Sequence, residues 1–439
     1  MDNLASKKNP LFIHLTLLLD AQGYTSWKSL CFKDKLYFYT FSHPLLRILR
    51  ISYNFYIDEP VGSGKEVIHI MKLICSKSEL QKSVTISLKA VSSKTTMPIL
   101  ECILINASGS EITFTSNDME LGIETKVHGI IEEKGMVALD AKLFSEIIRK
   151  LPDSDVVIKT DEKLNTTITC EKAKFTIPGR DGEDFAYLPV IEKNDGIVLS
   201  QYTLKEVIRQ TIFSIAANEN NKLMTGELFE IKDNILKVVS LDGHRIAIRK
   251  IELKETYKDR KVVVPGKTLN EISKILSGEV EDQVQIFFTD NHIVFEFDDT
   301  VVVSRLIEGE YFRIEQMLSS DYETKIKINK KEFLNCIDRA TLFVKEGEKK
   351  PIIITIEDNQ MVLNINSQIG SMNEDIDIMK EGKDIMIGFN PRFLIDALKV
   401  IDDEEITIYL VNPKAPCFIK DENESYIYLI LPVNFNTAR

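Results

Sequence analysis

The chain has 439 residues, a formal net charge of −12, 44% hydrophobic residues and 28% charged residues. This composition is ordinary for a globular protein and excludes a disordered, collagen-like or disulfide-dense chain, and its length suggests about three domains at roughly 150 residues each. Six scattered cysteines without a CxxC pair argue against a zinc ribbon and favour reduced thiols in a cytoplasm, and no apolar run approaches the ~18–20 residues of a membrane span.

Residues 1–70 differ in composition from the rest. They hold 11 of the 36 aromatic residues, including the single Trp27, and carry a charge of +2, so the remainder of the chain carries −14. Such a shift indicates a boundary. Residues 11–19 resemble a signal peptide but lack a cleavage site, and residues 62–65 resemble a phosphate loop without its flanking Gly and Ser/Thr. We interpret 1–70 as an extension outside the functional chain, with Met71 as the expected start.

A repeat of about 125 residues organises the remainder. Three nine-residue segments, Ala141–Arg149, Gly266–Lys274 and Pro391–Lys399, begin 125 residues apart. Their apolar residues recur at helical spacing, which predicts three equivalent helices. An apolar strand is expected before each helix, at Met136–Leu139, Val262–Val264 and Ile385–Phe389, and another after it, at Val156–Lys159, Val284–Phe288 and Ile406–Leu410.

A second helix opens each repeat, and alternating strand patterns lie between the two helices. The opening helices are predicted around Leu80–Leu88, Leu204–Phe213 and Phe333–Ala340, and the closing strands at Lys174–Ile177, Val301–Leu306 and Tyr426–Leu431. We therefore predict an α+β fold of three units, 71–192, 193–318 and 319–439, each with two helices packed on antiparallel sheet. About 120 residues suffice for each unit to bury a core of its own.

Each repeated helix carries two cations seven residues apart. The pairs are Lys142 with Arg149, Lys267 with Lys274, and Arg392 with Lys399. Residues i and i+7 share one helix face with a drift of only ~20°. One such pair alone is typical of a solvated face, but three at constant phase in an acidic segment predict a surface for a polyanion. Since no base-reading motif accompanies them, the contacts are expected to be with phosphates and independent of sequence.

Several motifs carry a family resemblance. They are Met71-Lys72-Leu73, Met97–Leu100 (resembling an early strand), Ser240–Ala247, Leu306–Gly309, Ile387–Asn390 and Leu429–Val433. In this order, residues 71–439 resemble the bacterial sliding clamp, the beta subunit of DNA polymerase III. The resemblance implies a head-to-tail homodimeric ring of clamp domains that encircles double-stranded DNA and tethers the polymerase for processivity. It implies neither catalysis nor a cofactor or metal.

The resemblance also implies binding residues. Lys94, Lys142, Asn218 and Lys222 correspond to DNA-facing positions, although the family has aromatic residues near Lys222 where this chain has Lys222 and Leu223. A pocket for short peptides of the polymerase III alpha subunit, the clamp loader and repair proteins is lined by Met224, Leu241, Gly243, His244, Arg245, Ile246, Met317, Asn390, Phe393, Leu431, Pro432 and Val433. At the homodimer contact, Phe175 and Ile177 are placed against Leu342 and Phe343, for which an alternative is core packing within a unit.

Two departures and two alternatives stay open. Leu241 replaces a family Thr, and the C-terminus continues past Val433. The first alternative is a DNA-acting enzyme, which needs clustered carboxylates with a metal, and the only acidic clusters of note are Asp181–Asp184 and Asp402–Glu405. The second is a monomeric scaffold without a ring. A catalytic or metal role for His244 is disfavoured because no second ligand stands at a suitable spacing.

Overall fold

The computed structural model describes residues 70–92, 95–194, 196–217, 221–318, 321–344 and 350–435. In 1–69 it describes only the backbone of three antiparallel strands, β1 (Trp27–Phe32), β2 (Lys35–Thr40) and β3 (Ile48–Leu49). The predictions for Lys94, Asn218 and the signal-like and phosphate-loop-like segments lie outside the described residues. The chain divides into compact parts 1–67 and 68–439, and the repeat occupies the second part.

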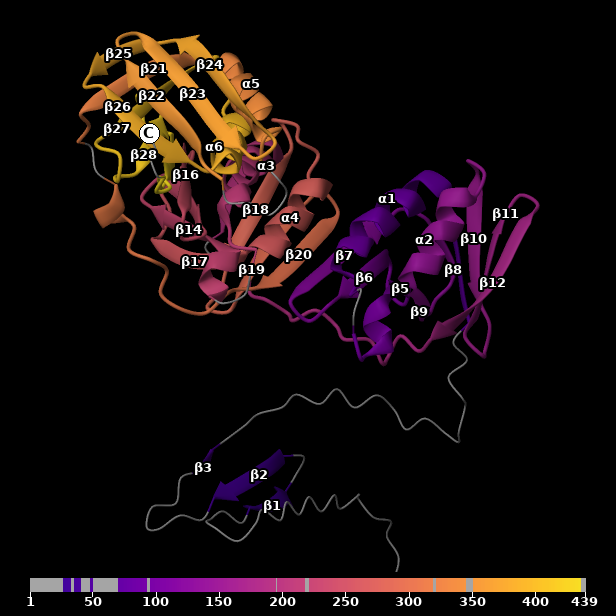
Figure 1. Cartoon of the computed structure of the whole chain (residues 1–439). Coiled ribbons are helices and arrows are strands. Elements are labelled where there is room, and N and C mark those ends of the chain that lie inside the picture. The colour runs from indigo at the N-terminus through magenta and orange to yellow at the C-terminus, as the bar shows by residue number, and fades with distance from the viewer. Residues whose placement is uncertain are drawn as a thin grey trace, which may run out of the picture. The chain divides into compact units, whose positions relative to one another are not determined.

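Residues 71–430 fold as one series of elements three times, except that the second unit lacks a counterpart of the short strands β8 and β25 (Figure 1). The first unit comprises β4 (Met71–Ser76), α1 (Lys77–Ser87), β5 (Cys102–Asn106), β6 (Ile112–Asn117), β7 (Leu121–Val127), β8 (Ile130–Glu133), β9 (Met136–Asp140), α2 (Ala141–Lys150), β10 (Asp155–Thr160), β11 (Asn165–Cys170) and β12 (Ala173–Arg180). The second comprises β13 (Ile197–Ser200), α3 (Gln201–Thr211), β14 (Gly226–Lys232), β15 (Ile235–Leu241), β16 (Arg245–Glu252), β17 (Arg260–Pro265), α4 (Gly266–Ile275), β18 (Gln283–Phe288), β19 (His292–Phe297) and β20 (Thr300–Arg305). The third comprises β21 (Thr324–Asn329), α5 (Lys330–Thr341), β22 (Ile352–Glu357), β23 (Gln360–Ser367), β24 (Gly370–Asp377), β25 (Met379–Gly382), β26 (Ile385–Phe389), α6 (Pro391–Val400), β27 (Glu405–Leu410), β28 (Cys417–Lys420) and β29 (Tyr426–Ile430). The predicted α+β class, with two helices in each unit against antiparallel strands, is confirmed.

The helices begin where a polar side chain caps their free amide groups. The Asp140 carboxylate accepts from the N–H of Leu143 at 2.8 Å, and the Asn390 side chain accepts from that of Arg392 at 3.0 Å. Such a cap stabilises a helix by about 1 kcal/mol. The helix α4 lacks a side-chain cap because Pro265 stands at that position. Lys142, Lys267 and Arg392 each follow their N-cap residue by two positions, which confirms the constant phase of the three helices.

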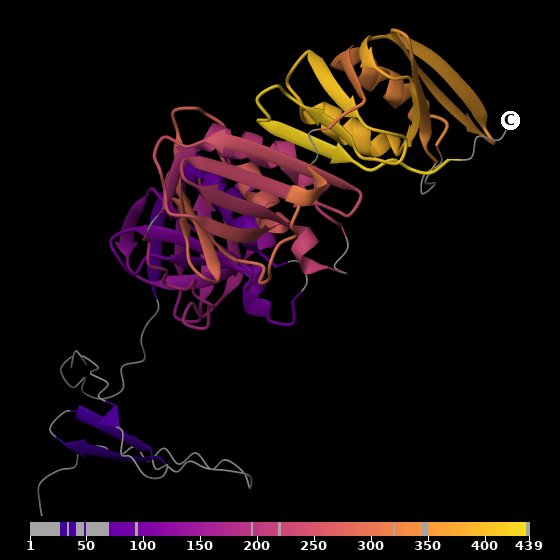
Figure 2. The ribbon, with the colours of Figure 1, turned by 90° about the vertical axis from the view of Figure 1, so that its left-hand side faces the viewer.

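Each unit buries its own core between its helix pair and its strands. Phe114 and Phe144 meet edge to face in the first unit, Phe229 and Phe295 are fully buried in the second, and Phe333 is buried in the third. The helices α5 and α6 lie side by side among the orange-to-yellow strands of the third unit (Figure 2). Among the described residues, no helix is both long and apolar enough to cross a membrane.

The expectation of an early strand at Met97–Leu100 is wrong. Pro98–Glu101 forms a 3-10 turn, and the strand β5 begins only at Cys102. Proline at the first position fixes φ near the helical value and removes an amide donor that a strand ladder would need. Ile99 of this segment packs against residues of β5 and β9, whereas Met97 is exposed.

Consecutive units are joined by one kind of strand pairing, used twice. The strand β7 of the first unit pairs antiparallel with β20 of the second, and β16 of the second pairs antiparallel with β29 of the third. Ile123 stands opposite Val302 in the first joint, and Ala247 stands opposite Tyr428 in the second. All four side chains are buried, so the cores continue across both joints.

Glu227, on β14 of the second unit, carries a fully buried carboxyl group. Its Oε2 accepts from the Thr211 hydroxyl at 3.1 Å, while its Oε1 has no hydrogen-bond partner within the part of the chain that the structure describes. Burial, opposed only by the Thr211 bond, raises its pKa from 4.5 to about 8. The group is therefore held as a neutral acid at pH 7.

We expect Glu227→Gln to remove a pH dependence of stability. Because the folded-state pKa lies above the unfolded value, the stability contribution of Glu227 is complete below pH 4.5 and is lost as the pH rises through about 8. The free energy of unfolding of the variant, relative to that of the wild type, should rise with pH between pH 4.5 and about 8. The slope should approach about 1.4 kcal/mol per pH unit. Urea unfolding between pH 5 and 9 measures the difference. Glu279→Gln, at an exposed position, is the matched control and should show parallel curves.

Candidate binding surfaces

The six predicted cations lie exposed, two on the second helix of each unit, as the sequence pattern requires. Lys142, Arg392 and Lys399 form no ion pair with any described residue. Arg149 binds Glu146 at 2.5 Å and Lys274 binds Glu271 at 2.7 Å, both within their own helix. These exposed pairs cost little to open, because surface ion pairs contribute about 0–1 kcal/mol.

Lys267 has a different environment from its two counterparts. Its ammonium binds the Asp118 carboxylate across the first joint, and that carboxylate is only 6% exposed. A cation held by a nearly buried partner is less available to an external phosphate than a free one. The helix phase predicted its exposure, but the turn at Asp118, far away in sequence, determines its partner.

A cavity of about 570 Å³ lies where α1 of the first unit approaches the end of α4. Lys77, Lys82 and Lys274 line it, together with Ser78, Thr85 and one carboxylate, that of Asp153. Lys77 and Lys82 carry no sequence signal, because no counterpart of the seven-residue pair marks the first helix. The arrangement offers three ammonium groups on a helix-lined surface, which suits phosphate oxygens.

An apolar cluster forms where the second and third units meet. Leu241 and Ile246 of the second unit share a buried cluster with Leu429 of the third, and Met224 packs against it. On its polar side, the ring of His244 stacks on Phe393 at 6.0 Å between centroids. The Leu431 amide donates to the His244 carbonyl at 2.9 Å, and the Val433 amide donates to that of Gly388 at 2.8 Å. The structure thus brings together residues that are widely separated in sequence.

The other predicted pocket residues take distinct positions. Gly243 has φ of +85°, a conformation that other residues adopt only at a cost, so the tight turn before His244 requires it. Asn390 caps α6, Met317 is 56% exposed, and Pro432 is half-buried between Leu431 and Val433. Tyr311, Ile314 and Phe418 belong to the same apolar cluster and were missed. Their burial arises from tertiary contacts that no local motif signals.

Arg245 lies largely buried beside this cluster. Its side chain is only 10% exposed, and its guanidinium bonds to Asp242 at 3.0 Å, Asp396 at 2.6 Å and the Phe213 carbonyl at 2.5 Å. It also lies over the Phe393 ring, 4.6 Å from the centroid. Because Asp242 and Phe213 belong to the second unit and Asp396 to the third, this one side chain links the two units.

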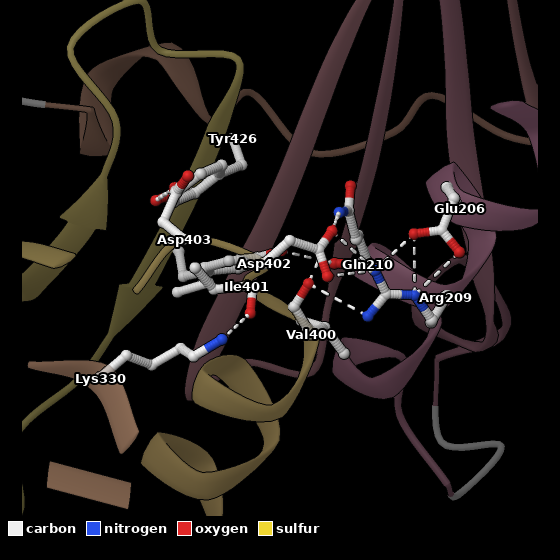
Figure 3. A network of polar contacts seen from close by, with 10 residues as sticks. Glu206, Arg209, Gln210, Lys330, Val400, Ile401, Asp402, Asp403 and Tyr426 are labelled. Atoms are coloured by element: carbon white, nitrogen blue, oxygen red, sulfur yellow. Dashed lines mark hydrogen bonds and ion pairs between the residues drawn. The ribbon is translucent and has the colours of Figure 1, made fainter. Parts of the chain in front are cut away.

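A second polar network joins α3 to the segment that follows α6 (Figure 3). Arg209 donates to Asp402 at 2.9 Å and to the Val400 carbonyl at 3.2 Å, and the Gln210 amide donates to Asp402 at 3.2 Å. The Tyr426 hydroxyl donates to Asp403 at 2.7 Å. Asp402 therefore holds the joint, while Asp403 is bound within the third unit. Among the described residues, no group of three or more His, Cys, Asp or Glu side chains could hold a metal ion.

The four residues placed at a homodimer contact divide into two kinds. Phe175 is 38% exposed on β12, and Leu342 is 73% exposed just after α5. Ile177 is 7% exposed in the core of the first unit, and Phe343 packs against the core of the third. Lys222, predicted to face DNA, is exposed in a short 3-10 turn.

Three family models match the chain, one for each repeat. They describe the DNA polymerase III beta subunit: its N-terminal domain over residues 71–189, its central domain over 198–312 and its C-terminal domain over 315–434. The beta sliding clamp of Staphylococcus aureus (strain Mu50) is 35% identical over 358 residues, which cover 79% of this chain and 95% of that protein.

Solved structures agree with these matches. A putative DNA polymerase III beta subunit from Eubacterium rectale is 70% identical, with a TM-score of 0.82 over 84% of this chain and all of that one. The DNA polymerase sliding clamp from Bacillus subtilis is 35% identical, with a TM-score of 0.81 over 83% of this chain and all of that one.

Proposed function

The chain belongs to the DNA polymerase III beta subunits, the beta sliding clamps, and we propose that it closes with a second copy into a ring around duplex DNA. Membership makes it a non-catalytic subunit in DNA replication. The ring would tether the polymerase III alpha subunit and serve as a docking site for the clamp loader and repair proteins. This work takes place in the bacterial cytoplasm. We also propose the domain boundaries expected from the repeat, 71–192, 193–318 and 319–439.

The observation that carries the proposal is the joint used twice within the chain. Each joint pairs the strand after the central hairpin of one unit (β7 or β16) with the last strand of the next (β20 or β29). The strand of the third unit that corresponds to β7 and β16 is β24, and the strand of the first unit that corresponds to β20 and β29 is β12. Among the described strands, these two have no partner from another unit. Repeating the same joint between two chains is a head-to-tail contact, which can close a ring.

Superposing the registers of the two joints predicts the contacts of the third. The central pair, Ile123 with Val302 and Ala247 with Tyr428, corresponds to Met372 on β24 and Phe175 on β12. The first four residues are buried, whereas Phe175 is 38% exposed. A partner chain would bury that ring against Met372.

The exposed Leu342 supports the same contact. Counted from the N-cap residues of α5 and α3, Leu342 occupies the position that Phe213 occupies in the second unit. Phe213 reaches across the second joint onto Tyr428, with ring centroids 5.7 Å apart. Because Tyr428 corresponds to Phe175, Leu342 of one chain is expected to pack on Phe175 of the other. Asp338 on α5 and Lys150 at the end of α2 are both exposed and supply opposite charges for this contact.

We propose that the helix cations, Lys222 and the cavity lysines face the DNA. Free cations at Lys142, Arg392 and Lys399 provide phosphate contacts without base recognition. Contacts of this kind are weak singly, which suits sliding, since retention would come from encirclement. The acidic remainder of the chain repels nucleic acid from its other surfaces.

Reversing two free helix cations should weaken DNA binding and its salt dependence. For Lys142→Glu with Arg392→Glu, we expect the slope of log affinity against log salt to fall by about one unit per cation. Titration of a 24-base-pair duplex at several salt concentrations measures it. Lys163→Glu with Lys254→Glu makes the same charge change at exposed positions outside the helices. An equal loss in both double variants would show that net charge, and not the helix face, determines binding.

We propose that the cleft between the second and third units takes the partner peptides. An apolar floor with a few polar groups at its edge suits a linear segment carrying Leu or Phe anchors. Leu241 and Ile246 are 5% exposed, so they support the floor, while Met317 and Leu431 are the exposed apolar side chains at its margin. The stacked pair of His244 and Phe393 offers a flat surface to an aromatic anchor.

A further inference from the structure

A second cavity lies at the joint between the first and second units. It has a volume of about 200 Å³ and is bounded by the turn before β7, by β19 and β20, and by the linker segment 186–189. Its apolar lining includes Met119, Tyr187 and Leu188, and its polar lining includes Glu120, His292 and Arg305. This space fits one or two side chains rather than a whole cofactor, because small-molecule sites generally exceed about 300 Å³.

This cavity is built on the same backbone arrangement as the peptide cleft. The Asp118 carboxylate accepts from the amides of Glu120 at 3.0 Å and Leu121 at 2.8 Å. The Asp242 carboxylate accepts in the same way from His244 at 2.9 Å and Arg245 at 3.1 Å. The amide of Arg305, the last residue of β20, donates to the Glu120 carbonyl at 2.9 Å. In the same way, the amide of Leu431, just after β29, donates to the His244 carbonyl.

The turn presents an apolar side chain where the other turn has glycine. Met119 has φ of +76°, matching the +85° of Gly243, yet it carries a side chain that is 54% exposed. A bulky residue in this left-handed region costs on the order of 1 kcal/mol and is found mainly at functional positions. Beside it, Tyr187 is 53% exposed. The two side chains give the cavity an accessible apolar rim.

The polar side of the cavity favours an anion. Arg305 is exposed and forms no ion pair with any residue that the structure describes, so its guanidinium is available. Burial, and secondly the charge of Arg305, lower the pKa of His292, which leaves that imidazole neutral and able to donate one hydrogen bond. Glu120 is the one carboxylate in the lining. A planar guanidinium without a partner is well suited to a carboxylate.

We propose that this groove, lined by Met119, Tyr187, Leu188, His292 and Arg305, is a second docking site for linear peptides. An apolar peptide side chain enters beside Met119 and Tyr187, and a neighbouring carboxylate binds Arg305. The inference rests on the proposed peptide role of the cleft between the second and third units, whose backbone it repeats. Two unlike sites would let one ring hold two segments of a partner, with the acidic one directed to the first joint.

Methionine methyl groups report on both sites in one experiment. Met119 lines the groove, whereas Met224 packs against the apolar cluster of the proposed cleft and the exposed Met317 is a predicted residue of that cleft. The full-length protein, labelled with ¹³C at the methionine methyls, is titrated with acetyl-Leu-Asp-Leu-Phe-amide and with its Asn analogue. We expect saturable shifts at Met119, and about tenfold weaker binding there with either the Asn peptide or the Arg305→Ala variant. Lys254→Ala, an exposed cation outside the groove, should leave the titration unchanged.

The outcomes separate the two sites. Shifts at Met317 without shifts at Met119 would overturn the second site and leave the cleft intact. Shifts at Met119 that ignore both Arg305→Ala and the Asn peptide would overturn the assigned carboxylate contact, and with it the proposal. Shifts at neither position would remove the peptide role of both sites. Because the Arg305 side chain is exposed, its truncation is expected to leave the fold intact, which thermal unfolding checks.

Discussion

Replacing Phe175 by Glu is expected to turn the protein from a dimer into a 50.1 kDa monomer. The residues that correspond to Phe175 in the two internal joints, Val302 and Tyr428, are buried against strands of the neighbouring unit. A carboxylate at the centre of such a joint would lose its hydration without gaining a partner, which costs several kcal/mol. Sedimentation equilibrium measures the mass, and loading onto circular DNA should be lost with the dimer.

The control for this substitution is Ile130→Glu. Ile130 is 63% exposed on β8, the end strand of the sheet, with β4, β10 and β11 between β8 and β12. It makes the same kind of change on an exposed apolar residue away from the proposed contact, so the dimer should persist. Circular dichroism checks that both variants fold. A Phe175→Glu protein that still sediments at twice 50.1 kDa would favour a different contact, and a wild type at 50.1 kDa would favour the monomeric scaffold.

Arg245→Ala is expected to open the joint between the second and third units. It would leave Oδ2 of Asp242, a side chain that is 14% exposed, and the Phe213 carbonyl without the donors of the guanidinium, and would remove the cation from the Phe393 ring. Removing one partner of a buried ion pair costs about 3–5 kcal/mol. Hydrogen exchange at Leu429, which pairs with Ile246 on β16, should speed up accordingly, and peptide binding at the cleft should weaken.

Arg313→Ala provides the matched comparison. Arg313 is also ion-paired, to Glu310 at 3.1 Å, but the two side chains are 79% and 74% exposed. Its loss should cost well under about 1 kcal/mol. Similar exchange rates in the two variants would show that Arg245 is not the tie between the units. Slow exchange at Leu429 with lost peptide binding would instead assign Arg245 to the cleft surface alone.

The repeated helices were predictable because their pattern is local. The repeat spacing and the seven-residue cation pairs can be interpreted from helix geometry alone, without knowledge of tertiary contacts. The helices α2, α4 and α6 begin at the expected phase. The prediction of a strand at Met97–Leu100 was wrong because an apolar run does not distinguish a strand from a 3-10 turn. Pro98 decided between them, since it lacks the amide donor of a ladder.

The candidate sites were predictable in place but not in detail. Family motifs located Leu241–Ile246 and Leu431–Val433, yet the roles within them depend on contacts across the joint. Lys267 is paired because Asp118 lies opposite, and Arg245 is buried because Asp396 reaches it from another unit. Tyr311 and Phe418 carry no sequence signal for the cleft. Such long-range pairings determine which side chains are free to bind a partner.

The central claim is that retention on DNA comes from encirclement. The most direct measurement loads the full-length protein onto a nicked circular plasmid with a clamp loader and then cuts half of the sample once with a restriction enzyme. Gel filtration gives the protein that remains on each DNA. Encirclement predicts retention on the circle and release from the linear molecule, because contacts with phosphates alone are too weak to hold the protein. Equal retention on circular and linear DNA would contradict encirclement and indicate ordinary binding to the duplex.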